Sequence, residues 1–285
     1  MNVIFDTNAY RCLAFSLRDL SEQDKIININ RIKIYQSKKD IKTPINFWVL
    51  SEILQHLCDV NDRGYKNCSE TLKIMLRHSS SNGNAMFSPM FEIRLARKFE
   101  DKTTEEHYKK LEINTAKLAI EFAENGRSEV FEKYICDVAN YVENYKNQLY
   151  KGFIDAKIEL KKAGNKSIPT GNEELHYLVL ISRINNILSF APELNKEILD
   201  ELNDTHYFGI ARTLKVLNNG YGYDFLSDDF LNNFVDQAIC DELGKNDDTI
   251  LVTDDSGVIS TFIEKNAANR TMKLNDYLNY IGFDQ

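Results

Sequence analysis

Three acidic residues directly follow segments that are predicted to be β-strands. Asp6 comes after the β-prone residues 2–5, and Asp254 and Asp255 come after the apolar segment TILVT, residues 249–253. Ligands of parallel α/β sheets bind at the carboxyl ends of the strands. We therefore expect these acids to face one edge of a sheet, where a binding or catalytic site would lie.

Two further acids lie within apolar segments that are predicted to be helical. Glu52 lies in residues 47–58, and Asp236 lies in residues 228–243. A buried carboxylate without a partner costs several kcal/mol or becomes protonated. A divalent cation would remove that cost if the acids converge. Oxygen ligands without His or Cys favour a hard ion, so the pattern predicts a Mg²⁺ or Mn²⁺ site of the kind that supports phosphoryl transfer.

Each acid also has an ordinary structural explanation. Asp6 could cap the helix that follows it, and Glu52 could pair with an arginine across a helix interface. Asp236 could be a surface residue, and Asp254 and Asp255 could form a turn. The joint occurrence of these acids favours the shared site over separate roles.

The order of predicted elements indicates an α/β domain that is interrupted by helices. Strand–helix units are predicted in residues 1–78 and 225–285, and only helices are predicted in residues 79–224. We therefore expect one domain made of the two terminal segments, with residues 79–224 as a helical insertion or subdomain. A heptad seam in residues 131–149 could form a dimer or pack within its own domain.

The composition is that of an ordinary globular chain. Its 285 residues carry a formal charge of −8, which argues against a generic nucleic-acid binder. No apolar run approaches the ~20 residues that span a bilayer, and the first residues do not resemble a signal peptide. The five cysteines are scattered, without zinc-ligand or redox spacing. These features predict a cytoplasmic protein that does not associate with membranes.

Four segments together resemble the signature blocks of the PIN-domain nucleases. They are VIFDTNAY, WVLSEIL, FVDQAICDELG and TILVTDDSG, and they occur in the family's order. The resemblance covers residues 1–78 and 225–285 and implies a three-layer α/β/α fold with a parallel sheet. The chain departs from a compact member because Glu52 and Asp236 are far apart in sequence. A strand expected before the Asp236 helix is not apparent.

The resemblance also implies a set of functional residues. The metal-binding and catalytic acids would be Asp6, Glu52, Asp236 and Asp255, and Asp254 is a less suitable alternative to Asp255. Supporting residues would be Asn8, which braces the first acid, and Thr253, whose hydroxyl bonds within the site. The implied cofactor is Mg²⁺ or Mn²⁺. The implied reaction is metal-dependent hydrolysis of RNA phosphodiester bonds, leaving a 5′-phosphate and a 3′-hydroxyl.

The expected function is therefore that of an endoribonuclease. One biological role is a toxin or phage-defence effector with a protein inhibitor or trigger, and the other is routine RNA processing. The alternatives are a structure-specific DNA nuclease and a non-cleaving scaffold that binds RNA or protein. Cations that could contact substrate phosphates are Lys38, Lys39, Lys161 and Lys162.

Overall fold

The computed structural model describes residues 1–81, 84–162, 173–219, 236–245 and 247–283. The chain forms two compact units. Unit 1 comprises residues 1–89, 111–139 and 248–285, and unit 2 comprises residues 90–110 and 140–247. Most of the described chain is helical, and the strands are few and short. No helix in the described part is both long and apolar enough to cross a membrane.

Unit 1 is built around short parallel strands. Strand β1 (Val3–Phe5) pairs with β6 (Ile250–Val252), which pairs with β7 (Thr271–Met272). Strand β2 (Ile45–Asn46) pairs with β5 (Phe87–Ser88). A parallel bridge between Asn2 and Lys42 joins the two groups. The strands thus form a three-stranded parallel sheet, β1-β6-β7, and a two-stranded parallel sheet, β2-β5, which the isolated bridge connects just before β2.

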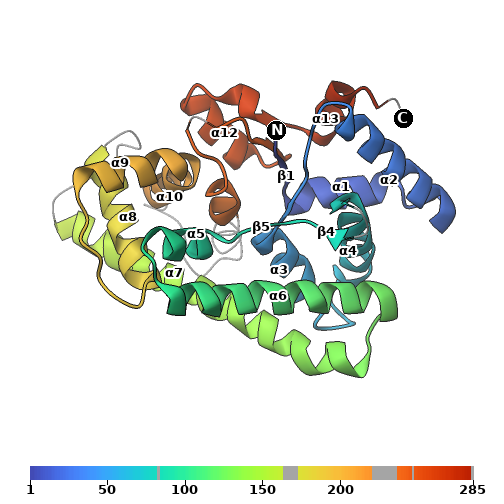
Figure 1. The fold of residues 1–285 in the computed structure, drawn as a ribbon, viewed down its shortest axis with the longest axis horizontal. Helices are drawn as coiled ribbons and strands as arrows, with labels where there is room; N and C mark the ends of the chain where they lie inside the picture. Colours follow the sequence, from blue (N-terminus) through green and yellow to red (C-terminus); the bar gives the residue numbers. More distant parts are fainter. Residues whose placement is uncertain (82–83, 163–172, 220–235, 246, 284–285) are drawn as a thin grey trace. The chain divides into compact units, whose positions relative to one another are not determined.

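The central strands are buried along their whole length. Every residue of β1 and β6 is buried, as expected for parallel strands that are covered on both faces. The helices that follow the amino-terminal strands are α1 (Thr7–Ser16), α2 (Glu22–Ser37), α3 (Phe47–Gln55) and α4 (Tyr65–His78). Those near the other end of the chain are α12 (Ser256–Glu264), the 3₁₀ turn η1 (Ala268–Arg270) and α13 (Leu274–Ile281). Helices α2 and α13 pack against each other (Figure 1).

Two long helices contribute residues to both units. Helix α6 (Lys102–Asn125) and helix α7 (Glu129–Lys162) match the long helical segments that the sequence predicts. Residues 111–139 belong to unit 1. There Arg127 donates to the backbone carbonyls of Leu57 and Cys58, and Phe122 packs against Phe131. The division into units therefore differs from the expected boundaries at residues 78 and 225.

The expectation that residues 79–224 contain only helices is wrong at the start of that segment. Strand β5 lies there, beside the short antiparallel pair β3 (Ser80–Ser81) and β4 (Asn84–Ala85). A strand of two residues is too short to produce an alternating apolar pattern, so periodicity could not reveal it. Residues 228–235 of the helix that was predicted around Asp236 lie outside the described chain, and residues 236–240 are helical.

Unit 2 is a helical assembly with its own apolar core. Its helices include α5 (Phe91–Lys98), α8 (Glu173–Ile187), α9 (Lys196–Thr205) and α10 (Tyr207–Asn219). The core joins residues from all four of these helices: Phe91, Leu95, Ala96, Leu180, Ile184, Leu199, Leu202, Ile210 and Leu214. Burial of such side chains contributes about 1.5–3 kcal/mol each, so this unit has a hydrophobic core independent of the sheet.

A buried ion pair crosses the core of unit 2. Arg183 donates to both carboxylate oxygens of Asp241, at 2.8 and 2.5 Å, and both side chains are buried. The Arg183 guanidinium also lies over the ring of Phe91, 4.2 Å from its centroid. Gly209 leaves room for the carboxylate, because a Cβ atom there would lie 1.8 Å from Oδ1 of Asp241.

We expect Gly209→Ala to disrupt this ion pair. The new methyl group would displace the Asp241 carboxylate, and breaking a buried pair costs about 3–5 kcal/mol. Urea denaturation followed by circular dichroism measures the loss. The matched control is Gly126→Asn, where φ is +67° and a Cβ atom meets no atom within 4 Å. Equal stability of the two variants would contradict the prediction.

Candidate functional site

The carboxyl ends of β1 and β6 meet at the point where the strand order reverses. From β1 the chain continues to β2 on one side, and β6 lies on the other side. Open parallel sheets bind ligands in the crevice that this reversal creates. Asp6 begins helix α1 at the end of β1, and Asp255 begins helix α12 near the end of β6. Two of the predicted acids therefore lie at the expected edge.

The hydroxyl of Thr253 links the two acidic residues. It donates a hydrogen bond to Oδ2 of Asp6, and it accepts one from the backbone N–H of Asp255 at 3.0 Å. Thr253 is fully buried, and its bond to Asp6 is buried, whereas its bond from Asp255 is partly buried. The Thr253 hydroxyl thus joins the ends of β1 and β6 through two hydrogen bonds.

Both aspartates also cap the helices that follow them. Oδ1 of Asp6 accepts from the N–H of Ala9 at 2.6 Å, and Oδ1 of Asp255 accepts from the N–H of Val258 at 2.6 Å. Capping and a role in the site are compatible, because a carboxylate has two oxygens and several acceptor positions. The expectation that Asp6 caps the following helix is therefore confirmed, and Asp255, which was expected to form a turn, is also a helix cap.

Burial gives Asp6 an unusual acidity. The residue is 4% exposed, and burial raises the pKa of its carboxyl to about 7, against hydrogen bonds from Thr253 and Ala9 that lower it. The negative charges of Glu52 and Asp255 raise this pKa further. Asp6, Glu52 and Asp255 are therefore within electrostatic range of one another, and near neutral pH Asp6 is only partly ionised.

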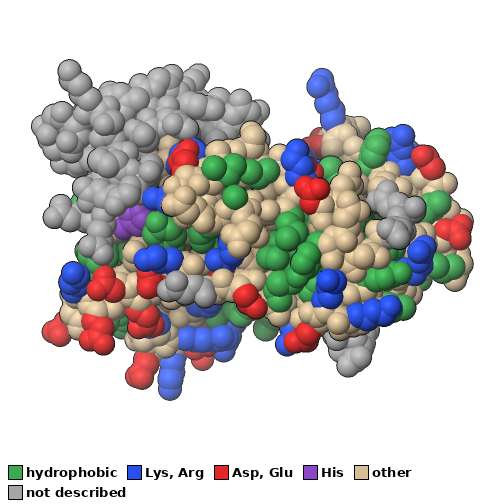
Figure 2. All heavy atoms as spheres, turned by 90° about the horizontal axis from the view of Figure 1, so that it is seen from above, with side chains coloured by type: hydrophobic (Ala, Val, Ile, Leu, Met, Phe, Trp, Pro, Cys, Tyr) green, Lys and Arg blue, Asp and Glu red, His purple; other side chains and the backbone are tan. Residues whose placement is uncertain are grey.

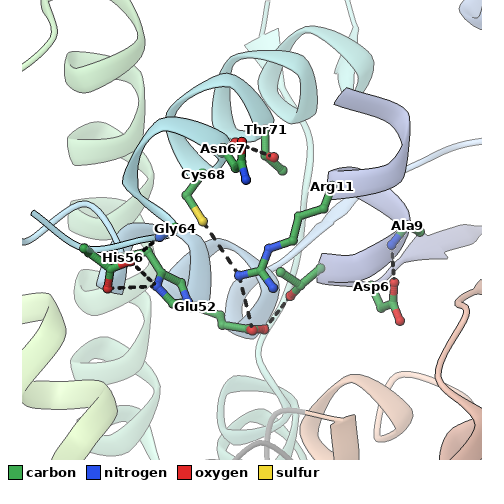
Figure 3. A network of polar contacts seen from close by, with 11 residues as sticks. Asp6, Ala9, Arg11, Glu52, His56, Gly64, Asn67, Cys68 and Thr71 are labelled. Carbon is green, nitrogen blue, oxygen red and sulfur yellow. Dashed lines mark hydrogen bonds and ion pairs between the residues drawn. The ribbon is translucent and has the colours of Figure 1, made fainter. Parts of the chain in front are cut away.

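Glu52 is held by two residues of helix α1. Its Oε2 accepts a hydrogen bond from Oγ1 of Thr7 at 2.5 Å, and its Oε1 lies 3.8 Å from the guanidinium of Arg11. Figure 3 shows Arg11 reaching between Glu52 and Cys68, whose sulfur lies 3.7 Å away. At 3.8 Å the ion pair is longer than a hydrogen bond, and it is partly exposed. Arg11 can therefore exchange this partner for another anion at low cost.

Sequence analysis missed Arg11. Thr7 and Arg11 are four residues apart on α1, so they lie on the same face of the helix. That spacing was the available signal, but only tertiary structure shows that α3 places Glu52 against this face. The same neighbourhood contains His56, whose Nδ1 lies 3.1 Å from Oδ1 of Asp62.

Other predicted residues have different surroundings. Asp236 belongs to unit 2, where it forms an ion pair with the buried Arg212 at 3.4 Å. Asn8 is exposed, and Asp6 is held by Thr253 and Ala9.

Asp254 is exposed and accepts a weak bond from the thiol of Cys12 at 4.0 Å. Lys161 and Lys162 end helix α7, and their side chains lie outside the described residues.

The donor chemistry of this edge fits a hard cation. Asp6, Glu52 and Asp255 offer only oxygen ligands, and their mutual repulsion would be relieved by a positive ion. Within the described residues, however, no three or more His, Cys, Asp or Glu side chains are already grouped as metal ligands. Binding would therefore require the carboxylates to reorient from their helix-capping and ion-pair contacts.

Comparisons with known proteins give no assignment. No family model, no curated protein and no solved structure matches the chain.

We expect Asp6→Asn to change how stability depends on pH in the absence of metal. The pKa of Asp6 is about 7 in the folded protein and near 3.8 when unfolded. Folding therefore favours the protonated carboxyl, and the stability that this form contributes is complete below about pH 4 and is lost as pH rises through 7. The variant cannot ionise and keeps that stability. In EDTA, the melting temperature of the variant relative to that of the wild type should increase from pH 5 to pH 8. The exposed Asp276→Asn is the control, and a flat difference for both variants would refute the shift.

We expect Thr253→Val to destabilise unit 1. The change keeps the shape of the side chain but leaves Oδ2 of Asp6 and the N–H of Asp255 without this partner, at about 1–3 kcal/mol for each buried group. Thr253→Ser retains the hydroxyl and is the matched control. Chemical denaturation should separate the two variants by about 2 kcal/mol or more, and equal stability would contradict the role of the hydroxyl.

Proposed function

We propose that this chain is a divalent-metal-dependent endoribonuclease of the PIN type, which hydrolyses RNA phosphodiester bonds. The observation that carries the proposal is the pairing of Asp6 with the Thr253–Asp255 turn at the reversal point of a parallel sheet. Glu52 adds a third acid within electrostatic range. A buried Asp6 with two half-buried acids in repulsive range is unfavourable for stability, and binding of a cation would offset that cost.

The strand arrangement supports the same assignment. The four sequence blocks that resemble PIN nucleases require a parallel sheet in which the first strand is central, and β1 has neighbours on both sides. The structure adds strand β5, which pairs with β2, whereas residues 220–235 directly before Asp236 lie outside the described chain. In the sequence, the helices from α5 to α10 lie between β5 and the segment that contains Asp236.

The proposed roles follow from the contacts of each residue. Asp6, Glu52 and Asp255 would hold Mg²⁺ or Mn²⁺, with Asp236 as the further acid that the resemblance implies. A bound ion supplies charge neutralisation at the phosphoryl group and lowers the pKa of water. Asp6 would release its proton on binding, because its pKa is about 7 without the ion. Arg11 would leave Glu52 and bind a non-bridging phosphate oxygen.

The direct test is cleavage of labelled single-stranded RNA and DNA with Mn²⁺ or with EDTA. We expect metal-dependent cutting of RNA, which Asp6→Asn and Asp255→Asn each reduce by about a hundredfold or more, as for groups that stabilise a transition state. Asp276→Asn removes an exposed acid and is the matched control. The same series with Asp236→Asn tests whether this residue of unit 2 takes part.

Each other outcome selects a different function. Cutting of DNA in preference to RNA would favour a structure-specific DNA nuclease. RNA binding without cleavage would favour a scaffold that retains its carboxylates for structure. If wild-type expression stops cell growth and the Asp6→Asn variant does not, the role is that of a toxin or defence effector with a protein inhibitor or trigger.

A further inference from the structure

A group of cations and aromatic rings lies on unit 1 at the opposite end of the strands from the acids. The basic–aromatic face consists of Arg31, Tyr35, Lys38 and Lys39, from α2 and the residues after it, and Tyr280 of α13. The face is next to the amino end of β1, because the terminal amine of Met1 donates to the carbonyl of Asp40. Strand β1 therefore separates it from Asp6 by about 10 Å of extended chain.

The cations of this face are held by rings. The Nζ atom of Lys38 lies 4.7 Å from the ring centroid of Tyr35, and that of Lys39 lies 4.6 Å from the centroid of Tyr280. The guanidinium of Arg31 lies 5.2 Å from the ring of Phe283, which is buried beneath the face. Such contacts restrict the position of a charge without neutralising it. The three charges are consequently ordered and still able to bind anions.

The cations of the basic–aromatic face differ from another cation of the same helix in having no acidic partner among the described residues. Near the start of α2, Lys25 is paired with Glu22 and Glu70. Arg31, Lys38 and Lys39 are exposed, and within the described chain none of them forms an ion pair with an acid. Asp40, the next residue after Lys39, is exposed, and its backbone carbonyl accepts from the terminal amine of Met1. In Figure 2, basic, acidic and hydrophobic side chains are interspersed on the right-hand part of the surface.

We propose that the basic–aromatic face is a second RNA-binding surface, which binds the phosphodiester backbone away from the site of cleavage. Arg31 and Lys38 are two helical turns apart, about 10 Å along α2, so they can contact separate phosphates of one strand. The partly exposed rings of Tyr35 and Tyr280 offer stacking surfaces for unpaired bases. The identity of RNA as the ligand rests on the proposed function, whereas the anion-binding surface does not require cleavage.

The test is binding of a short fluorescein-labelled single-stranded RNA in EDTA, measured by fluorescence anisotropy between about 50 and about 200 mM salt. We expect the triple variant Arg31→Gln, Lys38→Gln, Lys39→Gln to raise Kd by about tenfold or more at low salt. The slope of log Kd against log salt should fall by about 2, for three lost phosphate contacts. The double variant Lys38→Arg, Lys39→Arg keeps the charges and should bind almost as the wild type does.

The matched control removes three cations that have acidic partners. The variant Lys73→Gln, Arg97→Gln, Lys109→Gln has the same net charge as the test variant, but its cations are paired with Glu70 or Glu105. We expect a much smaller change in Kd and in the salt slope. Circular dichroism and the melting temperature confirm that each variant is folded.

Three outcomes would overturn the proposal. The first is no RNA binding by the wild-type protein in EDTA, and the second is equal loss in the test and control variants. The third is loss of binding to phosphatidylserine vesicles with RNA binding unchanged, which would assign the face to a membrane surface. Loss of RNA binding in a protein that cleaves no nucleic acid would instead refute the nuclease function and retain the binding surface.

Discussion

The hydroxyl of Thr253 is the interaction on which the proposed site depends. One oxygen donates to the carboxylate that ends β1 and accepts from the amide of Asp255 near the end of β6. It therefore sets the relative position of two strands, of the starts of α1 and α12, and of two acids. A residue without both a donor and an acceptor at this place could not satisfy the two groups, because the surroundings exclude water. The positions of the two acids and the packing of the sheet centre are thus determined by the same small group.

The electrostatics of this edge combine two opposing effects. The amino ends of α1 and α12 favour negative charge, since their first N–H groups point at the capping carboxylates. Burial and the neighbouring acids oppose ionisation, and for Asp6 they prevail. The backbone dipoles and the Thr253 hydroxyl orient the carboxylates, and the remaining repulsion is what the proposed cation would relieve.

Local chemistry made part of this structure predictable from the sequence. Strands β1 and β6 and the acids after them were evident, because an apolar run followed by a capping residue is a short-range signal. Strand β5 was missed, since two residues leave no periodic pattern. Arg11 was missed because its contact with Glu52 joins α1 to α3, and no local pattern encodes which helices become neighbours. The ion pair between Asp236 and Arg212 is likewise a tertiary fact that residue types alone do not reveal.

Residues 111–139 show that the long segment between the two terminal parts of unit 1 also contributes to the packing of that unit. Arg127 satisfies the carbonyls at the end of α3, and Phe122 and Phe131 contribute buried rings to unit 1. A minimal nuclease made by joining residue 78 directly to residue 225 would lose β5 and expose part of its own core. Engineering a compact version of this chain would require new capping and new apolar surface rather than a deletion.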